Sequence, residues 1–442
     1  MARMSTRFEV RIEWLDAPGV TTPELAATWA RYEIWLGTKC VTQVETADGT
    51  FRRSVYGSLY PLAYWIASNW WLLGSHLRPS AVDTRYWTWR NVQAYPWLKQ
   101  HNVRGAGDGM AWPDLTLVPE GAVTQLVWWL DDKAQQAPVR FASAGHGIVR
   151  TEEFRTDLAT IIDHVLERLA ESGLPKTPLT EEWSEIAKTG VEEQEFCQTS
   201  ARMGLDPYSV DDETASAIID AARELPADII DDFFDSADSG ALDAAVDWAR
   251  QAISAAEHAA DDTAQSLEPL YRLVTRSAKA DNERPWTSGY AMARRLRQEL
   301  SLAITDPFDV SPWVGVGDVS APSHGIYGFA SVHQDRCGVV LGSHGLGAAT
   351  TRFGQARALG RVLAHPGQRQ FVLSPTRSAD ERAARAFAAE LLAPASGIQT
   401  LLSDIGSNDD SALEAIAQQF EVSPLVVRHQ YDNQVAASRY DA

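Results

Sequence analysis

Long apolar runs, paired cysteines and an excess of basic residues are all missing from this sequence. Its 442 residues contain no stretch of 18 or more apolar residues that could span a membrane. The first residues lack the apolar core of a signal peptide, so we expect a cytoplasmic protein with no membrane partner. The three cysteines are isolated, which argues against a disulfide framework and against a cysteine zinc site.

The acidic charge is large and unevenly distributed. The formal net charge is −20, so phosphate backbones repel the chain and we do not expect it to bind nucleic acid directly. Residues 206–262 hold 16 Asp and Glu against two Arg, a local balance of −14. Two interpretations are open: the acidic helices keep the protein soluble, or they dock a basic partner or mimic DNA.

Residues 1–150 have the pattern of a mixed, antiparallel domain. Residues 7–14 alternate apolar and charged side chains, which predicts a half-buried strand. Turn residues at Asp48-Gly49 and at Pro119-Glu120-Gly121 predict two hairpins, and an apolar stretch at 60–76 predicts a helix. We therefore expect a multi-domain α+β protein whose first domain is aromatic-rich and of unknown role.

Tryptophan is concentrated near the N-terminus, where twelve of the 16 lie within residues 1–130. Trp87, Trp89 and Trp97 belong to the densest cluster, and they are our candidate binding residues. One hypothesis is that these rings stack on bases, sugars or a peptide. The other is that they form an aromatic core.

The remaining chain predicts two further domains. Residues 152–169 place their apolar side chains on one helical face, and Asp- and Ala-rich helical sequence with a hinge near Gly240 continues to about residue 280. We therefore predict an acidic helical middle domain at 151–280. A third domain at 283–442 combines two short strands with helices at 352–364, 379–392 and 411–434.

A helix in this third domain has the spacing of a zinc peptidase motif without its chemistry. Peptidases of the HExxH kind place two His one turn apart so that both imidazoles face one metal, and the intervening Glu accepts a proton from the metal-bound water. The corresponding residues here are Arg357-Ala358-Leu359-Gly360-Arg361. The spacing is retained, but the side chains are different.

Residues 283–440 resemble the ImmA/IrrE family of metallopeptidase-like domains. The family segment Arg-Phe-x-x-Ala-His-Glu-Leu-Gly-His corresponds to RFGQARALGR, and Glu-x-x-Ala-Asn-x-Phe-Ala-Ala-Glu-Leu-Leu-Met-Pro corresponds to ERAARAFAAELLAP. PWTSGYAMARRLRQEL and AIAQQFEVSPLVVRHQ resemble the family's first helix and closing helical pair. The resemblance implies a zincin-like α+β domain and a bacterial role in stress regulation, mobile-element control or phage defence.

The departures from the family motif determine what the domain can do. By the resemblance, Arg357 stands at the first His, Ala358 at the catalytic Glu, Arg361 at the second His and Glu381 at the third ligand. A guanidinium stays protonated at neutral pH and has no lone pair for zinc. We therefore expect no catalytic residue, no metal ligand set and no cofactor.

The retained Glu381 needs a different partner if it is buried. We expect an ion pair with Arg357 or Arg361 that links the two helices where zinc would have done so. The alternative is that both arginines face solvent and that Glu381 only stabilises the start of its helix. A zinc site rebuilt from His344 and His365 is a third possibility.

Three functions remain open on this reasoning. The first is a catalytically inactive pseudo-metallopeptidase that binds protein partners or acts as a scaffold or regulatory component. The second is a subunit of a larger nucleic-acid-handling or defence assembly that docks a basic partner. The third is an active metalloendopeptidase with a rebuilt metal site. The sequence does not identify the partner or the oligomeric state.

Overall fold

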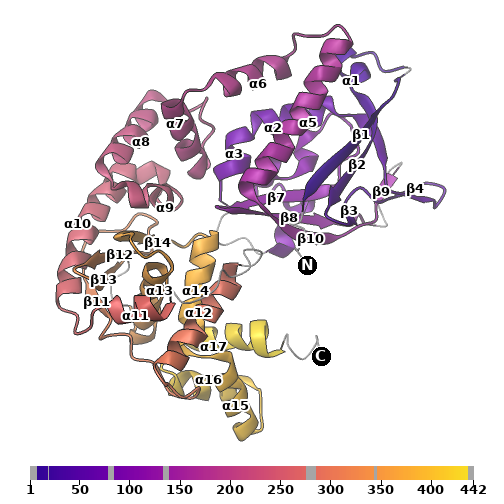
Figure 1. Cartoon of the computed structure of the whole chain (residues 1–442). Coiled ribbons are helices and arrows are strands. Elements are labelled where there is room, and N and C mark those ends of the chain that lie inside the picture. The colour runs from indigo at the N-terminus through magenta and orange to yellow at the C-terminus, as the bar shows by residue number, and fades with distance from the viewer. Residues whose placement is uncertain are drawn as a thin grey trace. The chain divides into compact units, whose positions relative to one another are not determined.

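The chain has a mixed α/β structure that divides into two compact units. The computed structural model describes residues 7–17, 19–77, 84–132, 139–274, 285–342 and 346–436. Unit 1 is Met1–Val210 and unit 2 is Asp211–Ala442 (Figure 1). The expected middle domain at 151–280 is therefore divided: its first helices belong to unit 1, and its acidic helices from residue 211 onward belong to unit 2.

The described part of unit 1 contains three small antiparallel sheets. Its strands are β1 (Phe8–Trp14), β2 (Trp29–Leu36), β3 (Lys39–Cys40), β4 (Val44–Thr46), β5 (Phe51–Arg52), β6 (Val55–Ser58), β7 (Asp114–Glu120), β8 (Val123–Trp129), β9 (Val139–Phe141) and β10 (Gly145–Arg150). The sheet orders are β1-β2-β3 with β6 also on β2, β10-β8-β7, and β5-β4-β9. The first strand and both predicted hairpins, β4–β5 and β7–β8, are confirmed.

Helices surround these sheets. They are α1 (Pro23–Ala27), α2 (Tyr60–Ser68), α3 (Trp70–Ser75), α4 (Leu98–His101), α5 (Thr151–Glu171), α6 (Pro178–Lys188) and α7 (Val191–Arg202), with 3-10 turns η1 (Thr84–Tyr86), η2 (Trp89–Asn91) and η3 (Val103–Ala106). The helix predicted at 60–76 is two helices, because the chain turns at Asn69. The apolar face of α5 is buried as its periodicity predicts, and each such side chain contributes roughly 1.5–3 kcal/mol.

Unit 2 is a four-stranded sheet with helices on both faces. Its elements are α8 (Asp212–Glu224), η4 (Ala227–Ile229), α9 (Ile230–Phe234), η5 (Ser239–Ala241), α10 (Leu242–Asp261), α11 (Glu268–Val274), α12 (Pro285–Glu299), β11 (Val314–Gly317), β12 (Gly328–His333), β13 (Arg336–Leu341), α13 (Ala348–Ala364), β14 (Gln370–Leu373), α14 (Ala379–Leu392), α15 (Ala395–Ile405), α16 (Asp410–Gln419), α17 (Pro424–Gln430) and the π-helical turn η6 (Tyr431–Ala436). The helices predicted at 352–364 and 379–392 are confirmed as α13 and α14, which pack together.

The sheet of unit 2 holds α10 unusually close. Its order is β11-β13-β12-β14, and only the β11–β13 pair is parallel. Gly338 of β13 faces α10, where an added Cβ would lie 1.9 Å from the carbonyl oxygen of Ala256. Leu341, three positions along the same strand, contacts Gly354 of α13 on the opposite face. The sheet therefore separates α10 from α13 (Figure 1).

Within the described ranges, no helix is both long enough and apolar enough to cross a bilayer.

The close contact of α10 with the sheet predicts a large effect of one methyl group. Gly338→Ala should lower the free energy of unfolding of unit 2 by about 3 kcal/mol or more, because the methyl group meets backbone atoms that cannot rotate away. Urea denaturation followed by circular dichroism measures the change. Gly347→Ala, where an added Cβ has no atom within 4 Å, is the matched control and should cost less than about 1 kcal/mol. Equal effects of the two substitutions would refute the close packing.

Candidate functional site

The motif residues of α13 lie in the interior of unit 2. Arg357 and Arg361 are each 3% exposed, and Ala358 between them is fully buried. Gly360, on the same helix, allows α13 to approach α14 closely, since a Cβ there would lie 2.7 Å from the ring of Phe387. The two arginines are therefore not solvated surface residues, which excludes the alternative that both face water.

Glu381 forms the expected ion pair with Arg357. It lies in the first turn of α14 with 0% exposure, and its Oε2 accepts a hydrogen bond from Nη2 of Arg357. Its other oxygen, Oε1, accepts from the backbone N–H of Ser374 at 3.1 Å. Arg357 also donates to the carbonyl oxygen of Ser374 at 2.9 Å and lies 4.6 Å from the ring centre of Tyr327. The pair thus ties α13, α14 and the residue after β14 together.

A second arginine completes the cluster. Nη2 of Arg385 lies 3.9 Å from Oε2 of Glu381 and donates to the carbonyl oxygen of Ser374 at 2.8 Å. Burial lowers the pKa of Arg385 to about 10, and the neighbouring charge of Arg357 acts in the same direction. Two guanidinium groups therefore share one buried carboxylate and one backbone carbonyl.

Arg361 pairs with other carboxylates. Its Nη2 donates to Asp232 of α9, and its Nη1 lies 3.2 Å from Oδ2 of Asp380. Burial opposes the charge of Arg361, but Asp232, Glu381 and Asp380 together raise its pKa. Burial likewise works to raise the pKa of Asp380, but the hydrogen bond from His365 and the charge of Arg361 hold it below its ordinary value.

These residues do not fit a zinc ion. Arg357 and Arg361, which the resemblance places at the first two ligand positions, present cationic nitrogen atoms without lone pairs. Glu381, which it places at the third, already binds Arg357 and Ser374. His365 contacts Asp380 at 3.2 Å rather than joining Glu381 in a ligand set. His344 lies outside the described residues. Within the described ranges, no three His, Cys, Asp or Glu side chains are close enough together to hold a metal ion.

Asp232 is the member of the site that sequence reasoning missed. It comes from the acidic segment that we assigned to a separate middle domain, and 129 positions separate it from Arg361. Nothing in its local sequence distinguishes it from the acidic residues around it. The same segment contacts the loop between α13 and β14, because the side chain of Gln368 donates to the carbonyl oxygen of Asp228 at 2.9 Å.

The candidate tryptophans of unit 1 are part of its core. Trp87 is fully buried and Trp97 is 7% exposed, and Trp89 packs against the same cluster with part of its surface exposed. The cluster also contains Val92, Leu98, Val118 and Val127. Because Trp87 and Trp97 are buried in this cluster, our assignment of these two rings to ligand binding is corrected in favour of the alternative, an aromatic core.

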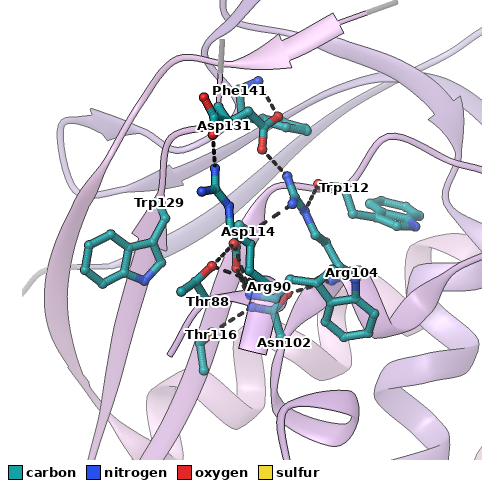
Figure 2. Close-up of polar contacts among 12 residues, drawn as sticks. Thr88, Arg90, Asn102, Arg104, Trp112, Asp114, Thr116, Trp129, Asp131 and Phe141 are labelled. Atoms are coloured by element: carbon teal, nitrogen blue, oxygen red, sulfur yellow. Dashed lines mark hydrogen bonds and ion pairs between the residues drawn. The ribbon is translucent and has the colours of Figure 1, made fainter. Parts of the chain in front are cut away.

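A buried polar network lies beside this core. Figure 2 shows Asp114 at its centre, where the carboxylate accepts from the hydroxyl of Thr88 at 2.8 Å and from the amide of Asn102 at 2.7 Å. Arg104 lies 3.9 Å from Asp114 and donates to Asp131, whose other oxygen accepts from the backbone of Phe141. Both carboxylates are engaged by hydrogen-bond donors, so we interpret the network as structural.

The buried ion pair predicts a strong effect of a nearly isosteric change. Glu381→Gln should lower the free energy of unfolding of unit 2 by about 3–5 kcal/mol, because it leaves the guanidinium of Arg357 buried without its counter-charge. Glu414→Gln removes an exposed carboxylate from α16 in the same unit and should change stability by less than about 0.5 kcal/mol. Urea denaturation of the two variants beside the wild type measures both. An unchanged midpoint for Glu381→Gln would show that the pair contributes nothing.

No family model and no curated protein matches the chain.

Proposed function

We propose that unit 2 is a zincin-like, catalytically inactive metallopeptidase relative that serves as a protein-binding, scaffold or regulatory component. The observation that carries this proposal is the buried ion pair of Arg357 with Glu381 at the two positions that correspond to metal ligands. The adjacent packing of α13 and α14 supports the alignment with the ImmA/IrrE pattern, since a zinc site needs these helices side by side.

Hydrolysis by the family's route requires groups that this chain lacks at the motif positions. Peptide hydrolysis needs a water made nucleophilic by a metal or a base, and a group that accepts its proton. Ala358 offers no proton acceptor, and Arg357 and Arg361 stay cationic. The carboxylates around them, Glu381 and Asp380, are engaged by arginine and histidine. The cluster holds structure together and contains no free base to activate water.

A role in binding a partner would use the exposed surface of unit 2. The resemblance suggests bacterial stress regulation or defence against phage and mobile elements as the setting. A second candidate is a subunit of a larger assembly that docks a basic partner, and the exposed acidic side chains of α8 and α10 favour it. These include Asp212, Glu213, Asp220, Glu224, Asp243 and Asp247. Co-purification that weakens with salt distinguishes this second candidate, because screening reduces attraction between exposed charges.

Restoring the motif tests the proposed relationship. A chain with Arg357→His, Ala358→Glu and Arg361→His should bind about one zinc ion, because two imidazoles and Glu381 would supply three ligands. The wild type should hold well under one equivalent. Inductively coupled plasma mass spectrometry of the purified proteins measures the metal, and zinc should also raise the melting temperature of the restored chain.

A control separates ligand restoration from the simple loss of two arginines. Arg357→Ala with Arg361→Ala removes the same charges without adding ligands, and it should gain no zinc. A restored chain that is folded by circular dichroism but binds no zinc would contradict the alignment. Stoichiometric zinc in the wild type that disappears in His365→Ala would instead support the active, rebuilt peptidase.

A further inference from the structure

Two imidazoles of unit 1 lie in direct contact away from the site described above. His101, at the end of α4, is fully buried, and its Nε2 lies 3.1 Å from Nδ1 of His76, the residue that follows α3. Nδ1 of His101 lies 3.1 Å from the carbonyl oxygen of Leu117 in β7. The ring of Trp97 stacks on His101 at 4.4 Å. Neither histidine belongs to the arginine–carboxylate cluster of unit 2 or to the site residues predicted from the sequence.

The hydrogen bonds of the pair assign its tautomers. The carbonyl oxygen of Leu117 can only accept, so Nδ1 of His101 carries a hydrogen and donates to it. Nε2 of His101 is then the acceptor in a neutral ring, and Nδ1 of His76 must donate to it. With both rings protonated, an N–H of His101 and an N–H of His76 would face each other and neither nitrogen could accept, so this bond would break. The observed contact therefore requires at least one of the two rings to be neutral, and it is lost when both carry the added proton.

Among the residues that the structure describes, no carboxylate acts to raise the pKa of either imidazole. Burial lowers the pKa of His76 to about 4, and burial followed by the charge of His76 lowers that of His101 well below its ordinary value. The carboxylates of the adjacent strand β7, Asp114 and Glu120, are hydrogen-bonded to Asn102 and Gln125. The other titratable groups on the elements around the pair are Lys99 on α4, Arg104 on η3, Glu192, Glu193, Glu195, Cys197 and Arg202 on α7, Arg155 on α5 beside Gly74, and Asp206 and Tyr208 after α7.

Hydrogen bonds hold the His101 side of the pair, whereas the His76 side belongs to α3, which is held by the packing of Trp71, Leu72 and Leu73 into the core. Asn102, next to His101, donates to both Asp114 and Thr116 at 2.7 Å, so the network of Figure 2 clamps this segment to β7. His76 lies at the end of α3, and its Nε2 abuts Gly204 after α7, where an added Cβ would lie 2.7 Å away. Separation of the rings would therefore loosen α3 from α4, β7 and the turn after α7.

We propose that His76 and His101 form an acid-sensitive latch that holds α3 on the body of unit 1 at neutral pH and releases it on acidification. In the open state each imidazole has its ordinary pKa of about 6.5. Because closure lowers the pKa of both rings, the closed state is fully favoured above about pH 6.5 and loses stability as the pH falls toward 4. Between these two pH values the histidines of the open state are protonated and protons must be released before the two rings can pair, so lowering the pH favours the open state.

Hydrogen exchange of the full chain tests the latch. Exchange of the α3 peptide 70–77 is compared at pH 7.5 and pH 5.0 by mass spectrometry, after correction for the intrinsic pH dependence. In the wild type the protection of this peptide should fall about tenfold or more at pH 5.0. His76→Asn keeps an N–H donor in place of Nδ1 but cannot titrate, so its loss of protection should be several-fold smaller.

The control is His146→Asn, which removes an exposed imidazole from β10 of the same unit and should behave like the wild type. Identical pH responses of the wild type and His76→Asn would overturn the latch. Should His76→Asn not fold, ring nitrogen shifts of the ¹⁵N-histidine-labelled wild type decide the matter. At pH 7.5 they should show both rings neutral with hydrogen on Nδ1, and any other tautomer at either residue would overturn the proposal.

Discussion

The buried charge of Glu381 is the constraint on which the arrangement of unit 2 depends. A carboxylate without water must be compensated by cations and donors, and a partly compensated one costs several kcal/mol. Arg357, Arg385 and the backbone of Ser374 supply that compensation. Their own positions are thereby fixed: α13 and α14 must lie side by side, and β14 must end where Ser374 can reach both helices. Under the proposed relationship to metallopeptidases, the ion pair would link the elements that a metal links in an active enzyme.

The same logic makes the acidic helices part of this unit. Arg361 is as buried as Arg357 and requires its own counter-charges, which come from Asp232 of α9 and Asp380 of α14. The segment before the sheet is therefore an integral part of the fold, and α10 closes the opposite face of the sheet through contacts that tolerate no Cβ at Gly338. Arg357 and Arg361, the two ends of the motif-like stretch, are thereby enclosed in the interior of unit 2.

Local sequence patterns were sufficient to predict many of the helices and hairpins, but not the contacts between distant segments that complete the site. Periodicity placed α5, helix-like sequence placed α13 and α14, and turn residues placed the β4–β5 and β7–β8 hairpins. The resemblance to the peptidase pattern led us to expect that Glu381 pairs with Arg357 or Arg361, and it pairs with Arg357. The predicted middle domain at 151–280 is divided between the two units, because helical periodicity does not say which hydrophobic core a helix joins. The contact of Asp232 with Arg361 joins distant segments, and the burial of Trp87 depends on neighbours from β7 and β8. Tertiary contacts of this kind leave no signature in the local sequence.

The coupling energy between Arg357 and Glu381 tests the central claim most directly. A double-mutant cycle compares the wild type, Arg357→Met, Glu381→Gln and the double variant by urea denaturation, so that effects on other neighbours cancel. If the pair has replaced a metal as the link between α13 and α14, the two substitutions should be strongly non-additive. The expected coupling is about 2 kcal/mol or more, with the double variant more stable than the sum of the single losses implies. A coupling below about 0.5 kcal/mol would contradict the account.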